Sequence, residues 1–184
     1  MLTFVFISLG VLLRVIPHPP NAAPIAALGL FGGANLQKKH ALLVPLAVMF
    51  ISDLFLGFHS LILWVYGSFL LIGLIGMWLK DKKTVGNVAA ASLFASILFY
   101  LTTNFGVWLE GKLYPPTLNG LTRCYYMALP FFRNTIVGDL IYTGVFFGAY
   151  ELANLTAKRL KPLSFKVRVP KTEDRIDDGS QRTA

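Results

Sequence analysis

Residues 84–109 read TVGNVAAASLFASILFYLTTNFGVWL and contain no aspartate, glutamate, lysine, arginine or histidine. The preceding residues 41–79 contain only two such side chains, Asp53 and His59. A helix needs roughly 20 apolar residues to cross about 30 Å of hydrocarbon. Both stretches are long enough, and they predict membrane-spanning helices.

The composition of the whole chain extends this interpretation. Of its 184 residues, 55% are hydrophobic and 14% are charged, whereas a soluble domain usually carries about 25% charged residues. A soluble fold of this size could not hide so much apolar chain from water. The single cysteine, Cys124, rules out an intrachain disulfide scaffold. The sequence therefore predicts an all-α integral membrane protein and excludes a soluble enzyme and a disordered chain.

Six apolar segments are candidate spans: Met1–Ile16, Ala22–Leu36, Ala41–Phe58, Leu61–Leu79, Thr84–Leu109 and Asn134–Asn154. The first lacks a basic leading region, so we expect a retained helix rather than a signal peptide. The second is short, and both a short tilted helix and a re-entrant turn fit it. We expect residues 1–157 to form a six-helix transmembrane domain. Residues 158–184 are expected to form a cytoplasmic tail, basic at first and then disordered.

Basic residues predict the orientation of these spans. Of 17 lysines and arginines, 13 follow the second, fourth and sixth segments. Cytoplasmic loops carry such an excess, so both termini are expected in the cytoplasm. The net charge of +8 comes mostly from these flanks, and it therefore does not indicate nucleic-acid binding.

Four polar residues lie at a similar depth in the predicted spans: Arg14, Asp53, Asn104 and Asp139. Each is roughly 5–8 Å below the outer boundary at 1.5 Å per residue. A lone charge deeper in the bilayer costs at least ~2.5–3.5 kcal/mol, so these groups are expected to meet around a wet cavity. Arg14 would pair with Asp53 or Asp139 and leave one carboxylate over. A ligand site and a structural salt bridge both fit, and the extra carboxylate favours the ligand site.

The predicted outer connections and the outer end of the fifth span hold further candidates. His18 and His59 could cap a pocket or bind a metal, although an ordinary interfacial position explains them more simply. Trp108 could stack on a planar ligand, but an aromatic belt at the membrane interface is the simpler explanation. The sequence contains no P-loop, dinucleotide fingerprint, His-Glu-x-x-His helix or Gly-x-Ser-x-Gly elbow. We therefore expect that the protein is not an enzyme and that it binds no cofactor and no metal.

Several motifs resemble those of a family of bacterial proteins with a proposed transport role. They are Arg14-x-x-Pro17-His18-Pro19-Pro20-Asn21-x-x-Pro24-Ile25-Ala26-Ala27-Leu28 with Phe31-Gly32-Gly33, Ser52-Asp53-Leu54-Phe55-Leu56-Gly57-Phe58-His59, Val65-Tyr66-Gly67-Ser68, Thr103-Asn104-Phe105-Gly106-Val107-Trp108, and Pro130-Phe131-Phe132-Arg133-Asn134-Thr135 with Gly138-Asp139. That family is in turn similar to the substrate-binding S components of energy-coupling-factor transporters.

The resemblance implies six helices, cytoplasmic termini and an outward-facing pocket for a vitamin-like micronutrient, in a multi-pass protein of the bacterial inner membrane. It adds Asn21, Arg133 and Asn134 to the candidate substrate-binding residues, because they stand in the matched motifs. The sequence thus predicts uptake of a small polar solute bound from outside. The alternative is a non-transporting membrane scaffold or assembly protein in which the polar cluster is structural.

The energy source is a separate question. S components that share an ATP-driven module usually carry Ala-x-x-x-Ala in the first helix, where the coupling protein docks. Met1–Ile16 contains no alanine, and the nearest pairs, Ala22/Ala26 and Ala23/Ala27, stand in the second segment. Small residues at that spacing, which Gly29 and Gly33 repeat, let helix backbones approach closely, either within the protein or against a partner. A shared energising module and a solitary transporter both remain open.

Overall fold

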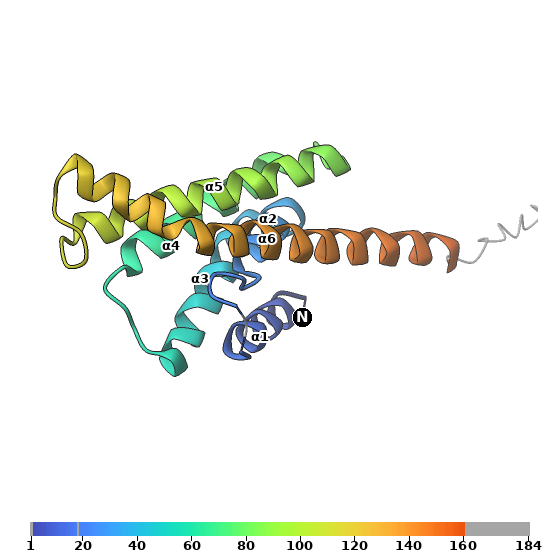
Figure 1. Cartoon of the computed structure of the whole chain (residues 1–184). Helices are drawn as coiled ribbons and strands as arrows, with labels where there is room; N and C mark the ends of the chain where they lie inside the picture. Colours follow the sequence, from blue (N-terminus) through green and yellow to red (C-terminus); the bar gives the residue numbers. More distant parts are fainter. Residues whose placement is uncertain (1, 18, 161–184) are drawn as a thin grey trace, which may run out of the picture.

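The computed structural model describes residues 2–17 and 19–160, which form six helices and no strand (Figure 1). The helices are α1 (Leu2–Val15), α2 (Ile25–Asn35), α3 (Lys38–Leu56), α4 (Ile62–Leu79), α5 (Val85–Leu109) and α6 (Leu118–Leu160). Each overlaps one of the six apolar segments, so the all-α prediction is confirmed. Most of the predicted tail, residues 161–184, lies outside the described residues.

Three of these helices are long and apolar enough to cross a membrane: α4, α5 and α6, the last counted over Leu118–Arg159. Large apolar side chains such as Leu63, Phe94 and Val145 are exposed on them. So wide an apolar surface suits lipid rather than water. The apolar parts of α1, α2 and α3 are shorter.

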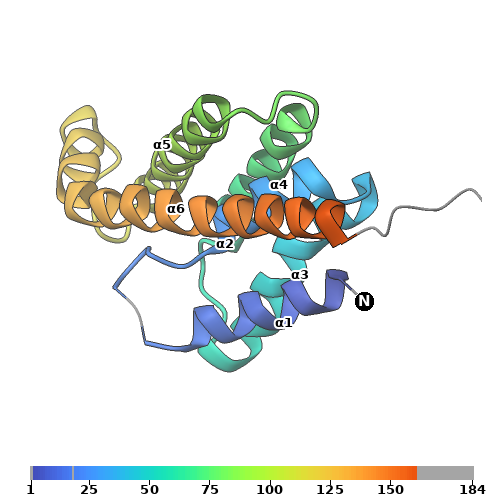
Figure 2. The ribbon, with the colours of Figure 1, turned by 90° about the vertical axis from the view of Figure 1, so that its right-hand side faces the viewer.

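Helix α2 lies at the centre of the bundle. All its residues from Ile25 to Ala34 are buried, and it packs against each of the other five helices. Figure 2 shows α2 behind α6. At about 1.5 Å per residue, its 11 residues reach roughly 16 Å, about half of the hydrocarbon thickness. The sequence allowed a short tilted helix or a re-entrant turn for the second segment, Ala22–Leu36. In the structure this segment forms a short helix that is enclosed by protein.

Glycines explain how α2 packs so closely on α4. A Cβ atom added at Gly33 would lie 2.5 Å from the carbonyl oxygen of Gly73. A Cβ atom added at Gly76 would lie 2.5 Å from the carbonyl oxygen of Leu30. Only residues without a side chain let the two backbones approach in this way. The spacing of small residues in α2 therefore serves packing within the protein.

Helix α6 begins earlier than the sequence predicted. Residues 110–133 were expected to form one long outer connection, but residues 118–133 are the first part of α6, and the connection is only residues 110–117. Both views show these first turns, in yellow, at an angle to the rest of the helix (Figures 1 and 2). Pro130 lies inside α6. Because proline lacks an N–H donor and clashes with the preceding turn, it is a usual cause of such a bend.

Lys83 connects three elements at one end of the bundle. Lys83, in the connection between α4 and α5, donates from Nζ to Asn35 Oδ1 at 3.0 Å. The same ammonium group lies 5.8 Å from the centre of the Tyr150 ring in α6. The end of α2, the α4–α5 connection and the later part of α6 therefore meet at this end.

The opposite end gathers the other connections. Asn134 of α6 donates from Nδ2 to the Pro20 carbonyl at 3.3 Å. A hydrogen bond from Ser60 holds the pKa of Glu110 below its ordinary value, and Lys112 acts in the same direction. The connections that follow α1, α3 and α5 thus lie together.

Candidate functional site

Arg14 and Asp53 form an ion pair that joins α1 to α3. Arg14 Nη1 lies 2.7 Å from Asp53 Oδ1, and Asp53 is only 1% exposed. Within the described residues, Oδ1 accepts no aligned hydrogen bond, so it is held by the charge. Nη1 also donates to the Met49 carbonyl at 3.2 Å and to the Ser52 hydroxyl. The last turns of α3 therefore fix one side of the guanidinium group.

The other oxygen of Asp53 is also occupied. The hydroxyl of Tyr66 in α4 donates to Asp53 Oδ2 at 2.7 Å. A buried carboxylate is stable when a counter-charge and hydrogen bonds replace its water. Arg14, Asp53 and Tyr66 thus form a closed polar cluster that ties three helices together, and Asp53 lines no cavity described here.

Asp139 of α6 is in a different position. It is 2% exposed, and its Oδ2 accepts a hydrogen bond of 2.7 Å from Ser96 in α5. Among the residues that the structure describes, no cationic side chain forms an ion pair with it. Its carboxyl group therefore has a neutral partner where Asp53 has a cation.

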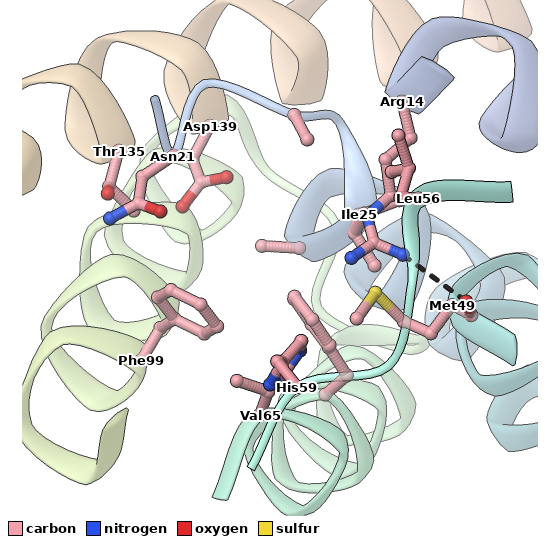
Figure 3. Close-up of a pocket in the computed structure, with 13 residues that line it drawn as sticks. Arg14, Asn21, Ile25, Met49, Leu56, His59, Val65, Phe99, Thr135 and Asp139 are labelled. Carbon is pink, nitrogen blue, oxygen red and sulfur yellow. Dashed lines mark hydrogen bonds between the residues drawn. The ribbon is translucent and has the colours of Figure 1, made fainter. Parts of the chain in front are cut away.

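A cavity of about 290 Å³ separates Arg14 from Asp139. Figure 3 shows the two residues on opposite sides, with one guanidinium nitrogen of Arg14 turned toward the cavity and the other contacting Met49. Every helix contributes to the wall. The lining residues are Arg14, Asn21, Ala23, Ile25, Ala26, Met49, Leu56, His59, Val65, Phe69, Phe99, Thr135 and Asp139.

A second cavity, also of about 290 Å³, adjoins the first. The two share Asn21, His59, Val65, Phe99 and Thr135 in their walls. The second has a strongly aromatic wall, and its remaining lining residues are Leu61, Tyr100, Thr103, Asn104, Val107, Ala128, Phe131 and Phe132. Together the cavities offer one chamber that carries Arg14 and Asp139 among apolar side chains, followed by an aromatic one.

Two exposed residues stand where the cavities meet the surface. Asn21 belongs to the connection after α1 and His59 to the connection after α3. Asn21 has a φ of 63°, in the left-handed region that asparagine tolerates better than most residues. Such uncommon backbone conformations are often found at functional sites. The described residues contain no group of three histidine, cysteine, aspartate or glutamate side chains able to hold a metal.

Five of the predicted site residues lie at these cavities. Arg14, Asn21, His59 and Asp139 line the first, and Asn104 lines the second together with Asn21 and His59. Asn104 also donates from Nδ2 to a carbonyl of its own helix at 2.8 Å. Residues from three helices and two connections thus line the two cavities.

Trp108, Arg133 and Asn134 lie outside the two cavities. Trp108 donates from Nε1 to two carbonyls of the 110–117 connection, at 3.1 and 3.2 Å, and lines neither cavity. Arg133 is exposed, and Asn134 contacts the connection after α1. Neither lines a cavity. His18 lies outside the described residues.

Some residues of the site were not among the predicted ones. Tyr66 belongs to the motif Val65-Tyr66-Gly67-Ser68, and this was the one feature of the sequence that could have indicated a role at the site. Ser96 and Thr135 are small polar residues, a type that is common in membrane helices and rarely diagnostic. Phe99 lines both cavities, but one phenylalanine within an apolar span carries no distinguishing pattern.

Comparison with known proteins gives a family and no function. No curated protein and no solved structure matches the chain. A family model matches residues 1–162, which include all six helices. The chain therefore belongs to the family described as a family of unknown function (DUF6580).

Proposed function

We propose that this protein binds a small polar solute from the outer side of the bacterial inner membrane and mediates its uptake. The observation that supports this most is the first cavity, which all six helices line. A buried carboxyl group faces it, and no cationic side chain of the described ranges pairs with that group. A bundle that needed only to pack would fill this space with apolar side chains. Ionisable residues that face a cavity inside a membrane protein are typical of solute pathways.

The membrane arrangement that we propose is a six-crossing bundle like that of an S component, with both termini in the cytoplasm. The six helices and the gathering of alternate connections at opposite ends support it. Helix α2 would complete its crossing inside protein, since it is shorter than the bilayer. Energy would come from a docked ATP-driven module or from an ion gradient.

Reporter fusions test this orientation. Reporters placed after Lys39, after Lys83 and at the C-terminus are expected to report cytoplasm, because basic connections stay inside. A reporter inserted after Pro116, in the short connection before α6, is expected to report the outside. A cytoplasmic signal there would place the cavity on the inner side and contradict uptake from outside.

The alternative, a non-transporting scaffold, has one observation in its favour. The cluster of Arg14, Asp53 and Tyr66 ties together α1, α3 and α4 without any ligand. This cluster alone would suit a protein that only holds its helices in place. It does not account for Asp139 and the two cavities beside it.

Two matched threonines of α6 separate these functions. Thr135 and Thr156 each donate a hydroxyl hydrogen bond to the carbonyl four residues earlier, at 3.0 and 2.9 Å. Thr135 is 5% exposed and lines both cavities, whereas Thr156 is exposed. Thr135→Leu should therefore fill the junction of the cavities, and Thr156→Leu makes the same chemical change away from them.

Native mass spectrometry of the purified proteins provides the measurement. We expect a co-purified small molecule on the wild type and on Thr156→Leu, and at least about tenfold less on Thr135→Leu, a loss that corresponds to about 1.4 kcal/mol of binding. Melting curves should show that all three proteins are folded. A wild type without any bound small molecule, or equal occupancy in the three proteins, would favour the scaffold.

A further inference from the structure

The charges around the first cavity are unequal. The charge of Arg14 is balanced by Asp53, at 2.7 Å. Within residues 2–17 and 19–160, the one side chain that donates to Asp139 is the neutral hydroxyl of Ser96, also at 2.7 Å. The other titratable residue in this wall is His59, which is exposed where the cavity meets the surface. Because Arg14 and Asp53 balance each other, Asp139 is the carboxyl group in this wall that has no cationic partner in the described part of the chain.

An ionised carboxyl group in this position would favour a positively charged ligand. Asp139 is 2% exposed, so little water solvates it, and a buried charge is stabilised chiefly by an opposite charge with hydrogen bonds. Among the described residues no lysine or arginine supplies that charge. The cavity that Asp139 faces (Figure 3) leaves room for a ligand to supply it.

The walls beside Asp139 suit the same kind of ligand. Phe99 lines both cavities and stacks on Phe69 with ring centres 5.2 Å apart. Tyr100 and Phe132 stack at 4.4 Å in the second cavity. Aromatic faces attract organic cations and also pack against flat apolar groups.

We propose that the solute is an organic cation, a protonated amine that pairs with Asp139 and extends an apolar or aromatic body past Phe99 into the second cavity. This rests on the proposed function and specifies its substrate class. The two adjoining cavities, about 290 Å³ each, together fall in the usual range for small-molecule sites. The guanidinium nitrogen of Arg14 that faces the cavity would donate to a neutral acceptor on the solute.

Three probes of one shape and different charge test the proposal: benzylammonium, benzyl alcohol and benzoate. Their dissociation constants are measured by calorimetry at pH 7 on the full chain in nanodiscs of uncharged lipid. We expect benzylammonium to bind at least about tenfold more tightly than benzyl alcohol, and benzoate to bind most weakly. Asp139→Asn should reduce benzylammonium binding to the level of the alcohol.

Asp81→Asn is the matched control. It removes the same charge from an exposed residue in the α4–α5 connection, at the end of the bundle away from Asn21 and His59. It should leave the order of the three probes unchanged. Phe99→Leu keeps Asp139 and should weaken benzylammonium binding about threefold, which gives a second readout if Asp139→Asn does not fold.

The outcomes separate this inference from the proposed function. Equal binding of benzylammonium and benzyl alcohol to the wild type would show that the carboxyl group of Asp139 keeps its proton. It would overturn the proposal that the solute is an organic cation. Tighter binding of benzoate, no binding of benzylammonium, or a preference that survives in Asp139→Asn would overturn it as well. The solute site would still be tested independently, by whether a small molecule co-purifies with the wild type and is reduced on Thr135→Leu.

Discussion

Gly33→Ala is expected to lower the melting temperature sharply or to prevent folding. The new Cβ atom would lie 2.5 Å from the Gly73 carbonyl oxygen and 2.6 Å from backbone atoms of Gly76 and Met77. Backbone atoms cannot rotate away as a side chain can, so α2 and α4 would have to separate. A methyl group added to a packed core typically costs about 1–3 kcal/mol of stability, and we expect at least this loss for Gly33→Ala.

Gly67→Ala is the control for this substitution. Gly67 lies in α4, the helix that Gly33 of α2 contacts, and a Cβ atom added at Gly67 would meet nothing within 4 Å. Alanine favours a helix by about 0.5–1 kcal/mol over glycine, so this variant should melt at or slightly above the wild-type temperature. Thermal unfolding in detergent, followed by size-exclusion chromatography, measures both. Equal melting of the two variants would contradict the close contact between α2 and α4.

The helices could be predicted because lipid imposes a simple requirement. Every backbone polar group must be bonded within its own segment, so an apolar stretch such as residues 84–109 has to be helical. α2 was less certain because its residues are apolar on every side. Such a pattern predicts burial but not whether the buried segment spans the membrane.

The start of α6 could not be predicted from apolarity. Arg123, Pro130 and Arg133 interrupt the apolar pattern between residues 118 and 133, and the segment was therefore assigned to a connection. In the structure both arginines are exposed, so their charges reach solvent or the lipid interface while the helix continues. Charge excludes a residue from the bilayer interior, but it does not end a helix.

The candidate site follows from the sequence only as far as the depth of a residue along its helix can be counted. Counting residues from the span ends placed Arg14, Asp53, Asn104 and Asp139 at one level. Which carboxylate Arg14 pairs with depends on how each helix is rotated about its axis, and that rotation is set by packing that the counting does not include. The same uncertainty applies to Trp108, which is in α5 like Asn104 but lines neither cavity.

Arg14→Ala is expected to destabilise the protein more than any other change at the site. It leaves Asp53, which is 1% exposed, without the cation now 2.7 Å away. Removing one partner of a buried ion pair costs about 3–5 kcal/mol, because the remaining charge stays buried. Asp53→Asn should also destabilise, but by less, because the Arg14 side chain is 14% exposed and reaches the cavity. Asp139→Asn should stay within about 1 kcal/mol of wild type, because it loses no charged partner.

The double variant Arg14→Ala with Asp53→Asn decides whether the pair is what holds these helices. It removes both charges, so it should be more stable than Arg14→Ala alone, although each substitution made singly is destabilising. Melting curves of the four variants and the wild type give this coupling. If Asp139→Asn were as destabilising as Arg14→Ala while Asp53→Asn were harmless, Arg14 would be paired with Asp139. The carboxylate without a partner would then be Asp53, and Asp139 could no longer be the residue that receives a solute.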